Sequence, residues 1–154
     1  MAHTQSLLHD GAVNSRSFSI VLVDDSDTFR LACQAALESV PGVKVVASAQ
    51  DGPSALALVR TAPPDLVILD IAMPGMGGLE VARQLKLLPE TPPFVFLSMN
   101  CSPEYQQIAS HMGAMAFVSK KDLFEELLPL VSHLTQGLHT ASPAHGTTSQ
   151  GDEP

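Results

Sequence analysis

Residues Pro64–Glu80 read PDLVILDIAMPGMGGLE, and this stretch decides the fold. A short apolar run ends at Asp70, and a turn containing Pro74 and Gly75 separates it from the start of an amphipathic stretch. A buried strand, a loop and a helix in this order form one βα unit of a parallel sheet. Because ligands of such sheets bind beyond the carboxyl ends of the strands, Asp70 is a candidate functional residue.

Short aliphatic runs of the same kind recur along the chain and alternate with amphipathic stretches. This alternation is typical of an α/β domain with a parallel sheet. The predicted strands are Phe18–Val23, Val43–Ala49, Asp65–Leu69, Pro93–Leu97 and Met115–Val118.

Helix start and stop signals lie between and after these strands. The first predicted helix presents an apolar stripe from Phe29 to Val40, and the third runs from about Leu79 to Leu88. The last is predicted to begin at Asp122 with a capping box formed with Glu125, and to kink or break early at Pro129. Its predicted buried residues are Phe124, Leu127, Leu128 and Val131.

The length and composition favour one domain with polar tails. A chain of 154 residues can bury one ordinary core, and residues 1–17 and 138–154 are predicted to be disordered tails around a domain at 18–137. The formal net charge of −8 disfavours direct binding to nucleic acid. No apolar stretch is long enough for membrane insertion, and the two widely spaced cysteines indicate neither a disulfide framework nor a zinc site, so we expect a cytoplasmic protein.

Polar residues follow four of the predicted strands. Asp24 and Asp25 follow the first, Asp70 the third, Ser98 the fourth and Lys120 the fifth. Carboxylates that converge at one sheet edge repel one another unless a cation intervenes, and Mg²⁺ suits Asp25 and Asp70 as direct ligands, with Asp24 acting largely through water. A carboxylate beside the metal can then serve as a nucleophile toward phosphorus, assisted by a hydroxyl and an ammonium.

Four motifs in this order resemble the receiver domain of bacterial two-component response regulators, over roughly Phe18 to Gly137. The acidic pair lies in VLVDDSDTFR (21–30), the phosphoacceptor in PDLVILDIAMPGMGGLE (64–80), the hydroxyl in FVFLSMN (94–100) and the lysine in GAMAFVSKKD (113–122).

The resemblance implies a flavodoxin-like, doubly wound parallel sheet of five strands in the order 2-1-3-4-5, with helices on both faces. It implies phosphorylation of Asp70 by a histidine kinase or phosphotransfer protein, and Mg²⁺ held by Asp24, Asp25, Asp70 and the Ala72 carbonyl. Ser98 and Lys120 would contact the phosphoryl group, and Phe117 matches the switch aromatic. A downstream protein would bind the face made by the fourth helix, the fifth strand and the fifth helix.

The sequence departs from many receivers at Lys121, which occupies the place of a cis proline, so we expect no cis bond there. This departure resembles a subgroup that usually carries a helix-turn-helix output domain, which these residues lack. The chain is therefore predicted to be a single-domain switch that catalyses only its own phosphorylation and dephosphorylation.

Two alternative functions remain open at this stage. A receiver fold can act as an adaptor that needs no phosphorylation. A phosphatase of the haloacid dehalogenase type also uses an aspartate and Mg²⁺, and Asp25-Ser26-Asp27-Thr28 nearly imitates its signature, although Phe29 breaks the pattern. Taken alone, Ser98 could simply bond the local backbone and Phe117 could be a core residue.

Overall fold

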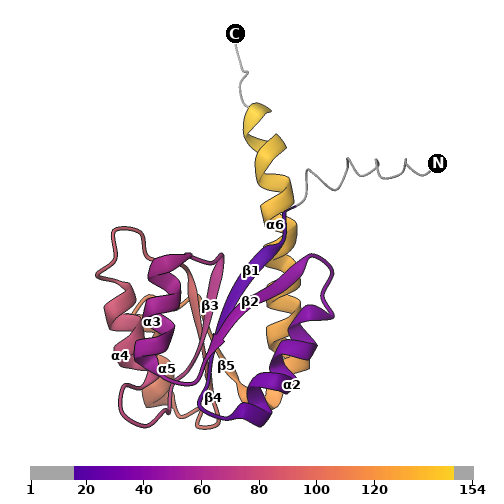
Figure 1. Cartoon of the computed structure of the whole chain (residues 1–154). Coiled ribbons are helices and arrows are strands. Elements are labelled where there is room, and N and C mark those ends of the chain that lie inside the picture. Colours follow the sequence, from indigo (N-terminus) through magenta and orange to yellow (C-terminus); the bar gives the residue numbers. More distant parts are fainter. Residues whose placement is uncertain (1–15, 148–154) are drawn as a thin grey trace, which may run out of the picture.

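The computed structural model describes residues 16–147, and the side chains of residues 16–137. It forms a five-stranded parallel sheet in the order β2-β1-β3-β4-β5, as predicted (Figure 1). The strands are β1 (Phe18–Val23), β2 (Val43–Ala49), β3 (Leu66–Asp70), β4 (Phe94–Ser98) and β5 (Ala116–Ser119). The helices are α2 (Asp27–Glu38), α3 (Gly52–Thr61), α4 (Gly78–Leu85), α5 (Pro103–His111) and α6 (Leu128–Thr147), with a 3₁₀ turn η1 (Lys120–Asp122) and a π-helical turn η2 (Leu123–Leu127) before α6.

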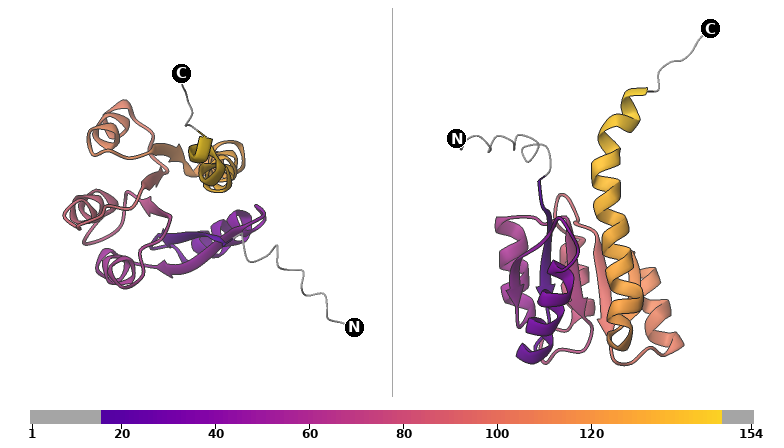
Figure 2. Two further views of the ribbon diagram at one scale, coloured as in Figure 1. Left: turned by 90° about the horizontal axis from the view of Figure 1, so that it is seen from above. Right: turned by 90° about the vertical axis from the view of Figure 1, so that its right-hand side faces the viewer.

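Helices cover both faces of the sheet, and alternation along the strands divides the core into two layers (Figure 2). In β1, Ile20 and Leu22 join the layer under α2 and α6, whereas Val21 and Val23 join the layer under α3, α4 and α5. Successive side chains of a strand point to opposite faces, so a strand buried on both sides is apolar throughout. This explains the continuous apolar run of Leu66–Leu69.

Three strands lie one residue later than the sequence predicts. The backbones of Asp70 and Ser98 still belong to the sheet, since Asp70 pairs with Leu97 and Ser98 pairs with Ser119. Asp65 instead lies before β3, where its carboxylate accepts hydrogen bonds from the backbone N–H of Ser19 at 2.8 Å and from Arg16. Asp70 and Ser98, at the carboxyl ends of β3 and β4, are therefore held in place by the backbone pairing of the sheet.

The segment after β5 differs most from the prediction. Asp122 makes no side-chain cap, so the predicted capping box is wrong, and Phe124 is 66% exposed rather than buried. In the π turn the N–H of Leu128 bonds to the carbonyl of Leu123, five residues back, and the extra residue rotates Phe124 out of the core. Leu127 and Val131 are buried as predicted, and Leu128 is partly buried.

The last helix does not break at Pro129, which lies in the first turn of α6, where its missing N–H costs little. The backbone is helical to Thr147, which lies within the predicted tail of residues 138–154. Once a helix is nucleated, each further residue adds a hydrogen bond, which favours continuation over fraying. Arg16, which lies in the predicted N-terminal tail, forms an ion pair with Asp65. Residues 1–15 and 148–154 of the two predicted tails lie outside the described residues.

The end of α4 and the peptide bonds can also be compared with the sequence. α4 ends at Leu85, three residues before the predicted Leu88. Within residues 16–147 no peptide bond is cis, as expected at Lys121, and no helix has both the length and the apolar character to span a bilayer.

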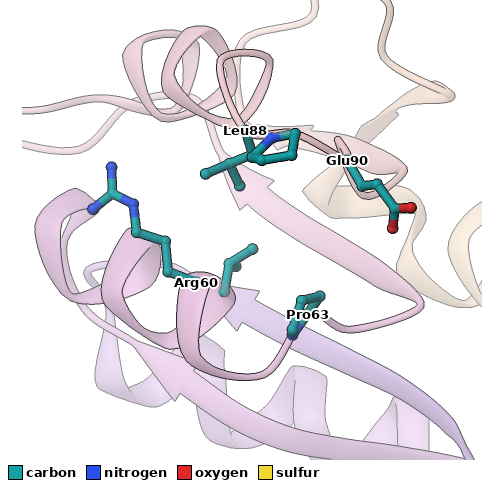
Figure 3. A pocket seen from close by; sticks show the side chains of 6 residues that line it. Arg60, Pro63, Leu88 and Glu90 are labelled. Carbon is teal, nitrogen blue, oxygen red and sulfur yellow. The ribbon is translucent and has the colours of Figure 1, made fainter.

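A cleft of about 410 Å³ opens at the amino ends of β3 and β4, away from the functional edge (Figure 3). It is lined by Val59, Arg60, Pro63, Leu88, Pro89 and Glu90.

Candidate metal centre

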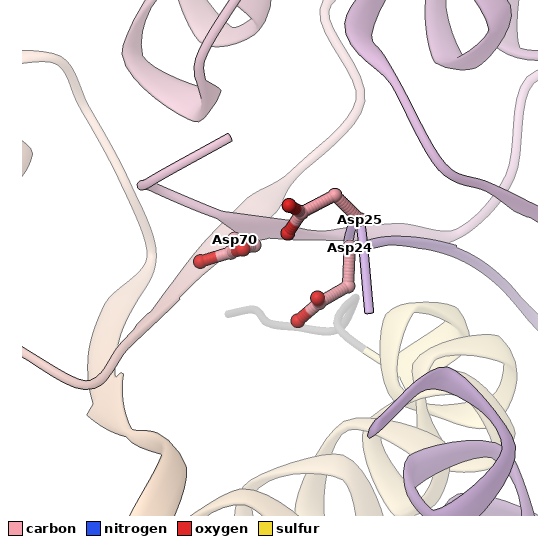
Figure 4. Close-up of side chains that lie close together, drawn as sticks. All are labelled: Asp24, Asp25 and Asp70. Atoms are coloured by element: carbon pink, nitrogen blue, oxygen red, sulfur yellow. The ribbon is translucent and has the colours of Figure 1, made fainter. Parts of the chain in front are cut away.

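Three aspartates meet at the carboxyl edge of the sheet. Asp24 and Asp25 follow β1 and Asp70 ends β3, and one carboxylate oxygen of each lies within 4.8 Å of the others (Figure 4). Asp24 and Asp70 are buried, whereas Asp25 is exposed. An ion that entered from solvent would therefore meet Asp25 at the surface and two buried carboxylates beneath it. Three hard oxygen donors are a suitable ligand set for Mg²⁺.

The loop after β1 fixes Asp24 in place. Its Oδ1 accepts the backbone N–H of Ser26 at 2.8 Å, and its backbone carbonyl accepts Arg30 Nη1 at 2.7 Å. Its Oδ2 is buried and, among the described residues, accepts no hydrogen bond; its counter-charge is the ammonium of Lys120, with Nζ at 2.5 Å. A buried carboxylate oxygen with unused lone pairs fits an additional cation at this site.

The ionisation of Asp70 is opposed by its surroundings. Its Oδ1 accepts the N–H of Ala72 at 3.2 Å, and its Oδ2 lies 3.4 Å from Lys120 Nζ. Burial, and then the charge of Asp24, raise the pKa of Asp70 to about 6, although Lys120 and Ala72 act in the opposite direction. A divalent cation would relieve this repulsion, which is a second reason why the cluster fits a metal.

Lys120 brings a positive charge into the cluster from the end of the edge strand, two strands away from β3. It follows β5, its side chain is only 11% exposed, and its Nζ reaches both Asp24 and Asp70. The ammonium also lies over the ring of Phe29, 4.4 Å from the centroid. The neighbouring Lys121 is exposed, so Lys120 is the lysine of this pair that reaches the cluster.

The side chains of Ser98 and Phe117 are both engaged by the structure around them. The Ser98 hydroxyl is buried, donates to the carbonyl of Asn100 at 2.8 Å and accepts the N–H of Asn100 at 3.0 Å. Phe117 is half-buried in β5, where it pairs with Phe96 and packs on the layer under α5. Their proposed roles toward a phosphoryl group stay predictions.

The imitation of the phosphatase signature does not extend to the geometry. The second aspartate of that signature, Asp27, begins α2, is exposed and pairs with Arg30 at 2.5 Å. It is not one of the clustered carboxylates. Asp27 therefore serves the first turn of a helix, where a negative charge is favourable.

Two residues at the site were not recognised from the sequence as parts of it. In the sequence, Phe29 belongs to an apolar helix stripe and breaks the phosphatase signature, and Arg30 has no assigned role. Their contacts with Lys120 and with the Asp24 carbonyl depend on how α2 docks beside β1. The only sequence signal was their position, one turn after the acidic pair.

Comparisons with known proteins agree with this arrangement. Residues 20–132 match the response regulator receiver domain. The chain is 35% identical over 107 residues to the protein-glutamate methylesterase/protein-glutamine glutaminase of Desulfotalea psychrophila, covering 68% of this chain and 29% of that protein. It is 31% identical over 126 residues to the response regulator GacA of Pseudomonas aeruginosa, covering 80% of this chain and 58% of GacA.

Solved structures show the same fold. The signal receiver domain of NarL from Mycobacterium tuberculosis superposes with a TM-score of 0.73 at 30% identity, covering 79% of this chain and 98% of that domain. The chain thus spans 29% and 58% of the two curated relatives but nearly the whole of this isolated receiver domain. The match of the family over residues 20–132, on the predicted sheet order, shows that the chain belongs to the response regulator receiver domain family.

Proposed function

We propose that this receiver domain accepts a phosphoryl group on Asp70 from a histidine kinase or phosphotransfer protein, with Mg²⁺ as the cofactor, in the cytoplasm. The observation that carries the proposal is the position of Asp70, which shares one site with Asp24, Asp25 and the ammonium of Lys120. Mg²⁺ would be held by these three aspartates and by the Ala72 carbonyl. When bound, the ion neutralises charge on the carboxylates and on the phosphoryl oxygens.

Each residue of the site has one task in the transfer. A carboxylate oxygen of Asp70 forms a bond to phosphorus while the bond from phosphorus to the donor imidazole nitrogen breaks, and the leaving imidazole keeps the electron pair and takes up a proton. Lys120 stabilises the charge on the transferring oxygens, because its ammonium already lies 3.4 Å from Asp70. Ser98 donates its hydroxyl to a phosphoryl oxygen once it leaves the carbonyl of Asn100.

The downstream effect is a change in the face made by α5, β5 and α6. Movement of the Ser98 hydroxyl breaks its bonds to Asn100, which precedes α5. Phe117 lies in β5, three residues before Lys120, and is half-buried. Its ring would turn inward into the space that the movement of the Ser98 hydroxyl opens. We propose that the partner that binds this face is a protein, because the formal net charge of −8 opposes direct contact with nucleic acid.

Asp70→Asn provides the direct test of this function. Incubated with Mg²⁺ and a small phosphodonor such as acetyl phosphate, the wild type is expected to gain one phosphoryl mass, measured on the intact protein. The variant keeps the size of the side chain but offers no carboxylate nucleophile, so we expect no gain.

The matched control is Asp27→Asn, which removes an exposed carboxylate at the same edge and should be phosphorylated like the wild type. A folded wild type that gains no mass would contradict the proposal. It would favour the phosphorylation-independent adaptor instead.

A further inference from the structure

We propose that Phe29 is a positioning residue for the phosphoryl-transfer reaction, and that its ring holds the Lys120 ammonium toward Asp70. The inference rests on the proposed function and gives a role to a residue for which the resemblance to the receiver domain implied none. It depends on a contact of this chain, in which Nζ of Lys120 lies 4.4 Å from the centre of the Phe29 ring.

Lys120 is surrounded by partners of two different kinds. Two are carboxylates, with Asp24 Oδ2 at 2.5 Å and Asp70 Oδ2 at 3.4 Å from Nζ. The third is the face of an uncharged ring, whose quadrupole attracts a cation, and more strongly where water is excluded. The 11% exposure of the Lys120 side chain indicates that this site is largely dry.

The ring itself is held in place by the start of α2. Ser26 caps the helix, since its Oγ accepts the backbone N–H of Phe29 at 3.1 Å and its own N–H bonds to Asp24. Arg30, the next residue, ties the same turn to the carbonyl of Asp24. Phe29 is partly buried against the core layer under α2 and α6. Its position is therefore fixed relative to the acidic pair.

The two kinds of partner respond differently when the site is used. Both carboxylates belong to the cluster that would hold a cation, and Asp70 loses its charge when it forms an acyl phosphate. The attraction of Lys120 to the carboxylate oxygens themselves then weakens, and the charged phosphoryl oxygens replace them as partners of the ammonium. The ring of Phe29 is uncharged and is not part of the acidic cluster, so phosphorylation does not alter it. It therefore keeps the ammonium near Asp70 throughout the reaction. Phe29 thus provides the constant part of the lysine's environment.

The test compares Phe29→Leu, which removes the aromatic face but keeps an apolar side chain, with Phe29→Tyr, which retains the ring. Leu31→Ala, at an exposed position two residues along the same helix, is the matched control. For each protein the rate of phosphorylation by acetyl phosphate is measured at saturating Mg²⁺, together with stability against urea. We expect Phe29→Leu to react about fivefold more slowly, while Phe29→Tyr and Leu31→Ala react at nearly the wild-type rate.

A second readout does not depend on the reaction. Protons of the Lys120 side chain that lie over an aromatic ring resonate upfield in the NMR spectrum. We expect this shift in the wild type and in Phe29→Tyr, both before and after addition of Mg²⁺ with beryllofluoride, and its loss in Phe29→Leu. If Phe29→Leu does not fold, Phe29→Met replaces it in both measurements.

The outcomes separate this inference from the proposed function. A wild type that is not phosphorylated overturns the proposed function, whatever the NMR shift shows. If the wild type reacts and Phe29→Leu reacts equally fast, the positioning role is overturned. An equal loss of rate in Phe29→Tyr or Leu31→Ala would also overturn it, because the aromatic face would then not be the cause.

Discussion

At the scale of single residues, the site is a balance of charges held mostly out of water. Asp24 and Asp70 would repel each other in a buried site, and Lys120 compensates for part of this with one ammonium shared between them. The sequence predicted that these residues would lie close together, because each follows a strand and strand ends converge. It could not predict the ring of Phe29 under Lys120, since that contact depends on the rotation of α2 about its axis.

The stability of the metal-free protein should depend on pH through Asp70. Its pKa is raised from 3.8 to about 6, so the folded chain binds the proton more tightly than the unfolded chain does. Its contribution to the free energy of unfolding is therefore present at low pH and is lost as the pH rises toward about 6. We expect Asp70→Asn, measured in EDTA by urea unfolding, to gain about 1–2 kcal/mol relative to the wild type between about pH 4 and about pH 7.5.

The comparison with the wild type at each pH cancels the other titrating groups. A difference between the two proteins that stays constant over this range would show that Asp70 is not destabilised by burial and by Asp24. A difference that became smaller at higher pH would contradict the direction of the shift.

At the scale of elements, the sequence predicts which strands and helices form, and in what order, better than it predicts the residues at which they begin and end. β3 and β4 each extend one residue further than expected because Asp70 and Ser98 remain in the hydrogen-bonded ladder. The last helix was the least predictable element. Its apolar residues fit an α-helical stripe from Asp122, but the π turn before Pro129 shifts the register and exposes Phe124. Hydrophobic period alone does not reveal such an added residue.

The loop between β3 and α4 depends on the absence of a side chain at Gly78. A Cβ there would lie 2.2 Å from the backbone oxygen of Asp70 and 2.9 Å from the Cα of Ile71. Because neither backbone atom can yield cheaply, Gly78→Ala should destabilise the fold by about 2 kcal/mol or more and displace Asp70. Urea unfolding measures the first effect, and the rate of phosphorylation measures the second.

Gly137→Ala is the matched control within α6. A Cβ at that position would meet no heavy atom within 4 Å beyond its own turns of the helix, and alanine is the better helix former. We expect this variant to be about 0.5–1 kcal/mol more stable than the wild type. Equal effects of the two glycine substitutions would contradict the close approach at Gly78.

At the scale of the whole molecule, the site exists only when the complete sheet has formed. Asp24 and Asp70 come from neighbouring strands, whereas Lys120 follows β5 at the edge of the sheet, beyond β4. The two core layers hold these strands in register, so positioning of the charges depends on burial far from them. The chain order of motifs could therefore predict the site as a set, while the distances within it required the fold.

We propose that this site directs a phosphoryl group to Asp70 with the help of Mg²⁺. Reduction of the acyl phosphate with borohydride converts the phosphorylated aspartate to homoserine, which mass spectrometry of peptides can locate. After treatment with acetyl phosphate, we expect homoserine at position 70, none at Asp24 or Asp25, and none anywhere when EDTA replaces Mg²⁺. Homoserine at a different aspartate, or at position 70 to the same extent without Mg²⁺, would contradict the account.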